Sequence, residues 1–215
     1  MQKVILFQGD SITDCGRNRQ DIANLGEGYP VYVSSSLAND SVNEYKFINK
    51  GVSGNRIIDV YARIKCDIIN LKPDYMSLLI GVNDVWHEIN WQNGVDLDKF
   101  EKFYDMLLTE VKEALPNIKI MLLEPFVLEG PATCGDENVP DRLERFKKNV
   151  PLYGAVARKM AEKHGCKFIE LQNKFDEAAQ KAGSTTYWLR DGVHPSYAGH
   201  ELLKREWLKA FEEIK

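Results

Sequence analysis

The stretch VILFQGDSITD, residues 4–14, joins an apolar run to a polar turn. Residues 4–8 carry mainly the aliphatic, β-branched and aromatic side chains that are typical of a buried strand, and Gly9 follows directly. Ser11 comes two residues later, so its hydroxyl would stand at the exit of that strand, where a nucleophile can be exposed. The stretch therefore predicts a first strand that brings a candidate nucleophile to the edge of a sheet.

Four further runs have the composition of strands: residues 45–49, 75–80, 118–123 and 167–171. The segments between them repeat apolar side chains with the period of a helix. This alternation predicts an α/β fold, with a parallel sheet covered by helices on both faces, in a single domain that spans residues 1–215. Pro151 interrupts one helical pattern, and we expect a kink there or a helix that starts near Val150.

Three connections are longer than compact α/β units need: residues 11–29, 85–98 and 124–141. Each follows a strand and therefore emerges at its carboxyl end. Open α/β sheets bind their ligands at that edge. We therefore expect the functional residues to gather there.

The bulk composition excludes several kinds of partner. Lysine and arginine number 28 against 32 acidic residues, for a net charge of −4, and no basic stripe suggests a nucleic-acid partner. The N-terminal apolar run is too short for a signal peptide or a membrane span, so we expect a cytoplasmic protein without a membrane partner. The four cysteines lack the spacing of a disulfide framework or a metal site, and we expect free thiols and no metal.

A carboxylate and an imidazole stand close together near the C-terminus, in the turn Asp191-Gly192-Val193-His194-Pro195. A serine hydroxyl is a weak nucleophile at neutral pH, and it needs a base within hydrogen-bond reach and a third group that orients the base. The spacing of Asp191 and His194 lets one tight turn present both groups to Ser11. The sequence therefore predicts a serine hydrolase with Ser11, His194 and Asp191 as its catalytic residues.

Acyl transfer also needs donors for the negative charge that develops on the carbonyl oxygen. The backbone N–H of Ser11 is one candidate. Gly51 follows the second predicted strand, where its missing Cβ would let the backbone approach a ligand, and Asn83 follows the third and carries an amide donor. We expect these three groups to form an oxyanion hole.

These residues carry a family resemblance. The chain resembles the SGNH (GDSL-like) hydrolases through four segments in family order: Gly9-Asp10-Ser11-Ile12, Gly51, Gly81-Val82-Asn83-Asp84 and Asp191-Gly192-Val193-His194. The resemblance implies a three-layer α/β/α sandwich, flavodoxin-like, with a five-stranded parallel sheet in the order 2-1-3-4-5. It implies the same catalytic roles for Ser11, His194 and Asp191, the same oxyanion donors, and no cofactor.

Longer phrases around these segments, such as residues 9–17, 49–55 and 80–86, resemble the intracellular acetyl xylan esterase branch of the superfamily. That resemblance implies hydrolysis of short-chain acetyl esters on small carbohydrates such as xylo-oligosaccharides. Trp86 and Trp188 could stack on a sugar ring and Arg190 could bind its hydroxyls, so we expect these three residues to bind substrate. The sequence leaves the oligomeric state open, and a homo-oligomer is compatible with it.

Other functions remain open at this point. A general short-chain esterase or a lysophospholipase-like hydrolase would use the same catalytic residues. A metal-dependent phosphohydrolase would instead use acidic residues at the sheet edge to hold Mg²⁺, namely Asp10, Asp14, Asp84 and Asp191. That scheme leaves His194 and Asn83 without a role, and a sugar-binding module without activity leaves the Ser, His and Asp set unexplained.

Overall fold

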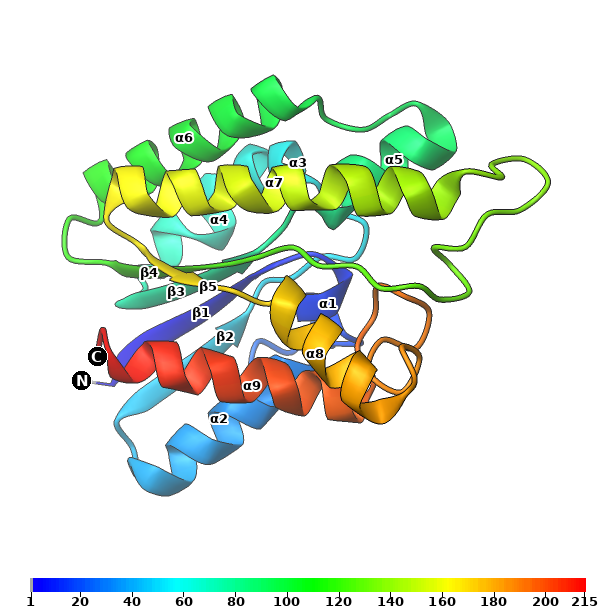
Figure 1. Ribbon diagram of the computed structural model, residues 1–215. Coiled ribbons are helices and arrows are strands. Elements are labelled where there is room, and N and C mark those ends of the chain that lie inside the picture. The colour runs from blue at the N-terminus through cyan, green and yellow to red at the C-terminus, as the bar shows by residue number, and fades with distance from the viewer. Residues whose placement is uncertain (1) are drawn as a thin grey trace.

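A computed structural model describes residues 2–215 and shows a parallel sheet between two layers of helices (Figure 1). The five strands lie in the order β2-β1-β3-β4-β5. Their bounds are Lys3–Gly9 for β1, Tyr45–Asn49 for β2, Tyr75–Leu79 for β3, Lys119–Leu123 for β4 and Lys167–Ile169 for β5. The predicted α/β class, the parallel sheet and the strand order 2-1-3-4-5 are confirmed.

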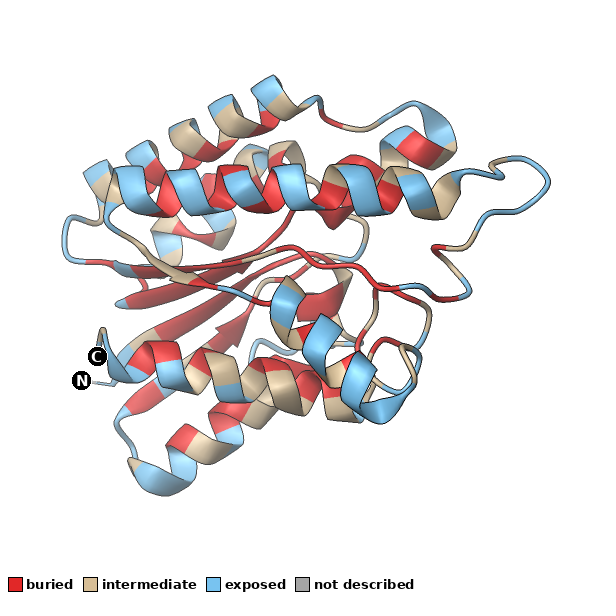
Figure 2. Ribbon diagram, in the orientation of Figure 1, coloured by how far each residue is buried: buried red, intermediate tan, exposed pale blue. Residues whose placement is uncertain are grey.

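β1 is an inner strand and carries the residues that lead into the site. Its Leu6 lies opposite Ile48 of β2 and Met76 of β3, and all three side chains are buried. A strand covered on both faces carries apolar side chains at successive positions instead of alternate ones. This explains the almost continuous apolar runs of the sequence, and Figure 2 shows the strands as the buried centre of the molecule.

Helices cover both faces of this sheet. α3 to α7 lie on one side, and α2, α8 and α9 lie on the other (Figure 1). Their bounds are α1 Ser11–Asp14, α2 Tyr29–Asp40, α3 Ile57–Ala62, α4 Ile64–Asp67, α5 Val82–Trp91, α6 Leu97–Ala114, α7 Arg142–His164, α8 Gln172–Ala182 and α9 Tyr197–Glu212, with a short 3₁₀ helix at Ile69–Leu71.

One of the two alternatives expected at Pro151, a helix that starts near Val150, is wrong, and so is one expected connection. α7 runs from Arg142 to His164 with Pro151 inside it, so no helix starts near Val150. Proline removes one helical hydrogen bond, but Phe146, Val150 and Tyr153 remain buried on both sides of it, and this packing outweighs the loss. The expected connection at residues 85–98 is largely helical as well, because α5 extends to Trp91 and α6 begins at Leu97.

The carboxyl ends of three adjacent strands define the functional edge. β1 leads into α1 at Ser11, residues 50–56 connect β2 to α3, and β3 leads into α5 at Val82. The turn at residues 185–195, which precedes α9, lies beside α1 at this edge (Figure 1). Segments far apart in sequence are therefore neighbours because parallel strands share one carboxyl edge.

One cluster of buried apolar side chains includes residues of all five strands and of helices on both faces. A single domain spanning residues 1–215 requires such a core, and the domain assignment itself stays a prediction. Within residues 2–215, none of the helices has both the length and the apolar character needed to cross a membrane.

Candidate active site

Ser11 is the first residue of α1, and its hydroxyl meets the imidazole of His194. The distance from Ser11 Oγ to His194 Nε2 is 2.8 Å. Asp10 precedes Ser11 as the helix N-cap and accepts the backbone N–H of Ile12 at 3.0 Å, which fixes the turn between strand and helix. Residues 183 positions apart in the sequence therefore form one short polar contact.

The opposite side of the His194 ring meets Asp191. The distance from His194 Nδ1 to Asp191 Oδ2 is 2.6 Å. The other carboxylate oxygen accepts two backbone N–H groups of the same turn, from Val193 at 2.9 Å and from His194 at 2.8 Å. Because an ionised carboxylate only accepts, Nδ1 carries the proton and Nε2 faces Ser11 as an acceptor.

The loop between β4 and α7 holds this turn in place. The N–H of Leu128 donates to Gly192 O at 2.8 Å, and the N–H of Ala132 donates to Asp191 O at 2.9 Å. Gly192 has φ +99°, and a Cβ there would lie 2.4 Å from Thr133 Oγ1. The turn thus needs glycine for both its backbone conformation and its packing. The long connection at residues 124–141 fixes the position of this turn through these hydrogen bonds and contacts.

The pKa of Asp191 is lowered and that of His194 is raised, as base catalysis by His194 requires. Burial alone would raise the pKa of Asp191, but hydrogen bonds from the His194 ring and from two backbone N–H groups outweigh it and lower that pKa to about 2. The same hydrogen bond from His194 to Asp191 raises the pKa of His194 above its ordinary value, against the opposing effect of burial. Asp191 is therefore ionised wherever His194 is neutral.

Asn83, the second residue of α5, lies beside the loop that follows β2. Its side chain is 5 % exposed, and Nδ2 donates to Asn55 O at 3.2 Å. An amide nitrogen carries two hydrogens, so this bond leaves one of them for another acceptor. Asn83 thus keeps a donor that the fold holds in one orientation.

The structure does not support Gly51 as an oxyanion donor. Its N–H is buried and donates to Asn49 Oδ1 at 2.9 Å. A Cβ at residue 51 would lie 2.3 Å from the backbone nitrogen of Asp14, so glycine is needed there to let the loop pack against α1. The backbone of Gly51 does make a close approach, as expected, but it approaches the backbone of Asp14 and not a ligand.

Gly54 is the glycine that the sequence analysis missed. Within residues 2–215 its N–H has no hydrogen-bond acceptor, whereas every other backbone N–H of residues 50–57 has one. No neighbouring atom lies within 4 Å of where a Cβ of Gly54 would stand. Asn55, the next residue, accepts the Asn83 amide. The sequence signal was the second glycine of the phrase Gly51-Val52-Ser53-Gly54, which sequence spacing alone does not separate from the first.

A cavity of about 240 Å³ opens beside Ser11 and His194. Its walls include Ser11, His194 and Pro195, and Arg190 and Glu27 bring opposite charges to it. Arg190 is exposed in the structure. The expected position of Arg190 next to the candidate nucleophile therefore agrees with the structure.

The two tryptophans predicted to bind substrate differ in position. Trp86 lies beside His194, with ring centroids 6.0 Å apart, and its other neighbour is Phe146 at 5.7 Å. Neither Trp86 nor Trp188 is among the residues that line the cavity containing Ser11, and their expected binding of substrate stays a prediction. The indole N–H of Trp188 donates to Ala178 O of α8 at 2.9 Å, and Trp188 lines two other hollows, one beside α8 and one between α8 and α9.

Cys15 and His200 complete the wall of the cavity. His200 Nδ1 accepts the N–H of Tyr29 at 3.1 Å, which leaves the proton on Nε2, 3.5 Å from Cys15 Sγ. Burial lowers the pKa of His200 to about 4 and raises the pKa of the Cys15 thiol. Both groups are therefore neutral near pH 7 and make this wall uncharged.

The edge aspartates are held separately. Asp84 accepts the N–H of Ile57 at 3.1 Å, and Asp14 accepts the N–H of Ser53 at 3.0 Å. Burial raises the pKa of Asp10 to about 7 and that of Asp84 to about 8. Within residues 2–215, no group of three or more His, Cys, Asp or Glu side chains is placed to hold a metal ion.

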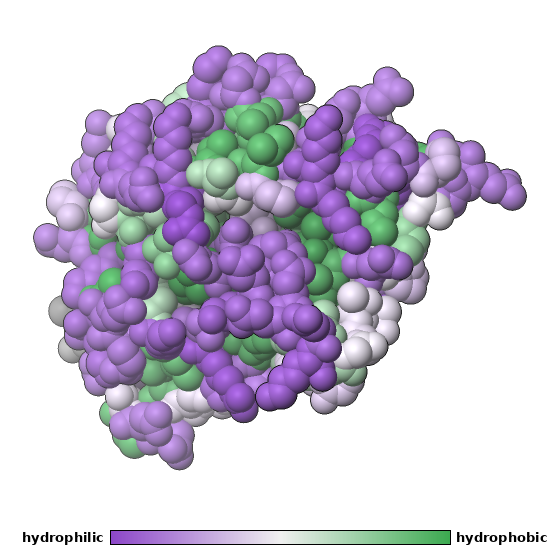
Figure 3. Space-filling view, in the orientation of Figure 1, coloured by the Kyte–Doolittle hydropathy of each residue, from purple (hydrophilic) through white to green (hydrophobic). Residues whose placement is uncertain are grey.

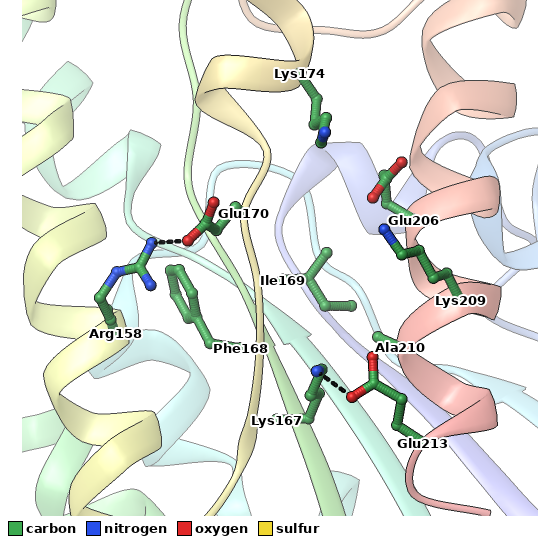
Figure 4. A pocket seen from close by; sticks show the side chains of 10 residues that line it. All are labelled: Arg158, Lys167, Phe168, Ile169, Glu170, Lys174, Glu206, Lys209, Ala210 and Glu213. Carbon is green, nitrogen blue, oxygen red and sulfur yellow. Dashed lines mark hydrogen bonds and ion pairs between the residues drawn. The ribbon is translucent and has the colours of Figure 1, made fainter.

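Figure 4 shows a different hollow, of about 320 Å³, beside β5 and between α7 and α9. Two ion pairs lie in it, Arg158 with Glu170 at 2.5 Å and Lys167 with Glu213 at 2.6 Å. It contains none of the residues of the Ser11 cavity. Figure 3 shows that this face of the molecule is mainly hydrophilic, with small apolar areas between the charged side chains.

Comparisons with known proteins agree with this geometry. Residues 7–202 match the profile of the GDSL-like Lipase/Acylhydrolase family. The chain belongs to this family. An acetylxylan esterase of Geobacillus stearothermophilus is 37 % identical over 224 residues, which cover 98 % of this chain and 95 % of that enzyme. The chain is therefore a carboxylic ester hydrolase.

Solved structures of GDSL-family proteins share the fold of this hydrolase. A GDSL-like protein from Parabacteroides merdae has a TM-score of 0.89 and 35 % identity, covering 99 % of this chain and 97 % of its own. Axe2, an acetylxylan esterase from Geobacillus stearothermophilus, has a TM-score of 0.83 and 35 % identity, with coverage of 97 % and 93 %. The similarity thus extends over the whole chain and includes all the segments that build the site.

The first prediction concerns the titration of His194 in the GDSL-family hydrolase. Its pKa lies above about 6.5 because Asp191 stabilises the protonated ring. Only the neutral ring can accept a proton, so kcat/KM should rise with pH through this raised pKa. NMR of the imidazole protons and a pH–rate profile should report the same value. In Asp191→Asn the pKa should fall, and a wild-type His194 that titrates at or below 6.5 would contradict the assignment.

Proposed function

We propose that the protein hydrolyses short-chain esters through an acyl-enzyme on Ser11. The observation that carries the proposal is the continuous hydrogen-bonded chain from Ser11 Oγ to His194 and from His194 to Asp191. Ser11 Oγ attacks the ester carbonyl while His194 Nε2 takes its proton. The same proton passes to the departing alcohol, and the C–O bond of the ester breaks.

The second half of the reaction reuses these groups. A water molecule gives a proton to His194 and attacks the acyl carbonyl, and the proton then returns to Ser11 as the carboxylic acid leaves. Asp191 stays ionised throughout and stabilises the imidazolium that forms twice in the cycle. No step needs a cofactor. Structures of catalytic mutants of Axe2, in which a serine or an aspartate is replaced by alanine, support these two roles.

For the oxyanion hole we propose the N–H groups of Ser11 and Gly54 and the side-chain amide of Asn83. Gly54 replaces Gly51 in this set, because Gly51 already donates to Asn49. The hydrogen bond from Asn83 to the carbonyl of Asn55, the residue that follows Gly54, supports this set because it ties the amide to the loop that carries the Gly54 N–H. Donors that are oriented before the reaction stabilise developing charge without reorganisation.

For the substrate we propose acetyl esters of small carbohydrates such as xylo-oligosaccharides. The cavity beside Ser11 is small, and its uncharged wall of Ile12, Cys15 and His200 suits a short acyl group or an ester methyl. Arg190 and Glu27 suit the hydroxyl groups of a sugar. The relatives named acetylxylan esterase support the same class. A general short-chain esterase or a lysophospholipase-like enzyme is the alternative outcome of the substrate test.

The proposed oxyanion hole predicts a selective loss of turnover in Asn83→Ala. Removing one such donor costs about 10²–10³ in kcat, while KM changes little, because the lost bond forms in the transition state. Steady-state kinetics with p-nitrophenyl acetate measure both constants. Asn39→Ala, an exposed asparagine on α2, serves as the matched control and should retain full activity. A folded Asn83→Ala enzyme with normal kcat would remove Asn83 from this role.

The substrate proposal predicts a narrow acyl range. A pocket that rejects added methylenes discriminates by about 1–3 kcal/mol, so acetate esters should exceed butyrate and longer esters at least about tenfold in kcat/KM. A series of p-nitrophenyl esters from acetate to octanoate measures this range, with Ser11→Ala as the inactive control. If octanoate is the best chain, the lysophospholipase-like alternative holds.

The carbohydrate part of the proposal is tested with acetylated xylo-oligosaccharides. Arg190→Ala should lower kcat/KM for these sugars by about tenfold more than for p-nitrophenyl acetate, because only the sugar offers hydroxyls to the guanidinium. Arg158→Ala, an arginine that lines the separate hollow of Figure 4, is the matched control and should affect both substrates alike. An enzyme that cleaves simple esters but leaves the sugar acetates untouched is a general short-chain esterase.

A further inference from the structure

Arg63, between α3 and α4, uses every donor of its guanidinium within the protein. Nε donates to Asn55 Oδ1 at 2.9 Å, and Nη1 donates to Lys50 O at 2.9 Å and to Asp67 Oδ2 at 2.8 Å. Nη2 donates to Gln8 Oε1 at 2.8 Å, with Gly9 O at 3.5 Å. A guanidinium has five N–H donors in a fixed plane, and here each has an acceptor.

These acceptors belong to two segments that meet at the candidate active site. Gln8 and Gly9 end β1 and lead directly into the turn that carries Ser11. Lys50 and Asn55 flank the loop that contains Gly54. The Arg63 side chain is 16 % exposed and makes no hydrogen bond to Ser11 or His194 among the described residues. It therefore connects the strand of the nucleophile to the loop of the oxyanion donors from behind.

The connection continues from this loop to the third donor. Asn55 accepts Arg63 through its side chain and accepts the Asn83 amide through its backbone carbonyl. Asn55 thus connects the Arg63 guanidinium to the Asn83 amide through two successive hydrogen bonds. A displacement of Asn55 would move the N–H of the preceding residue, Gly54, and it would also move the Asn83 amide.

Charge compensation stabilises this partly buried guanidinium. Asp67 pairs with Arg63 at 2.8 Å and with Lys50 at 3.1 Å. These hydrogen bonds lower the pKa of Asp67 in spite of the opposing effect of burial. Lysine would keep the positive charge but has three donors on a flexible stem, so it cannot reproduce the planar fork. The role of Arg63 depends on its shape more than on its charge.

We propose that Arg63 is a positioning residue for ester hydrolysis, which holds the oxyanion donors at a fixed distance from the Ser11 nucleophile. This inference rests on the proposed function, since it assumes that Ser11, Gly54 and Asn83 act on one carbonyl. A misplacement of about 1 Å can cost about 10²-fold in rate. Loss of the guanidinium fork should therefore slow the chemical step and leave substrate binding nearly intact.

The test compares Arg63→Lys with Arg158→Lys, a partly exposed arginine that lies far from this site in the hollow of Figure 4. With p-nitrophenyl acetate, kcat of Arg63→Lys should fall by about 10- to 100-fold. KM should change by less than about threefold in either direction. The pKa in the pH–rate profile should stay at its wild-type value, because the contact of His194 with Asp191 is untouched. Arg158→Lys should match the wild type.

A double-substitution cycle identifies the route of the effect. If Arg63 acts through the oxyanion donors, Arg63→Lys should cost less in an Asn83→Ala enzyme than in the wild type. Unchanged kcat in folded Arg63→Lys, or full multiplication of the two losses, would overturn the proposal. Inactive wild type, or an active Ser11→Ala, would instead overturn the proposed function.

A second variant keeps the test decisive if Arg63 is needed for folding. Asn55→Ala leaves the guanidinium in place with its bond to Lys50 O and removes only its bond to the Asn55 side chain. It should lower kcat in the same direction while the thermal midpoint stays within a few degrees of the wild type. Normal turnover in Asn55→Ala would contradict a positioning role for Arg63.

Discussion

The geometry of the site depends on the hydrogen bonds that the Asp191 carboxylate accepts. This carboxylate accepts three hydrogen bonds from within its own turn, two from backbone N–H groups and one from the ring of His194. The backbone bonds fix the carboxylate, and the fixed carboxylate selects the tautomer of His194 that can accept a proton from Ser11. A single four-residue turn thus provides both the base and the group that orients it.

The sheet determines where this turn can act. Parallel strands share a carboxyl edge, and the change of direction in the strand order places the ends of β1 and β3 next to each other. The loop after β2 then has almost no freedom, because nearly all of its N–H groups are bonded within the protein. The N–H of Gly54 has no acceptor among residues 2–215, and such a group is a ready donor for developing charge.

Much of the fold could be predicted from the sequence, because strands buried on both faces leave continuous apolar runs that are easy to recognise. The Ser, His and Asp residues of the proposed triad were recognisable as well, since the chemistry of a serine hydrolase restricts which residue types can serve. Gly51 and Gly54 could not be separated in this way, because the difference is one hydrogen bond to Asn49. The direction of Trp188 depends on its contact with α8, a tertiary contact that no local pattern reports.

The proposed function depends on the hydroxyl of Ser11 being the activated nucleophile of this hydrolase. Its most direct test is covalent labelling with a sulfonyl fluoride or an organophosphate, followed by peptide mass spectrometry. The account predicts one adduct, located on Ser11, that forms in the wild type and is lost in His194→Ala because the base is missing. An adduct on any other residue, or labelling of Ser11 that is unchanged in His194→Ala, would contradict it.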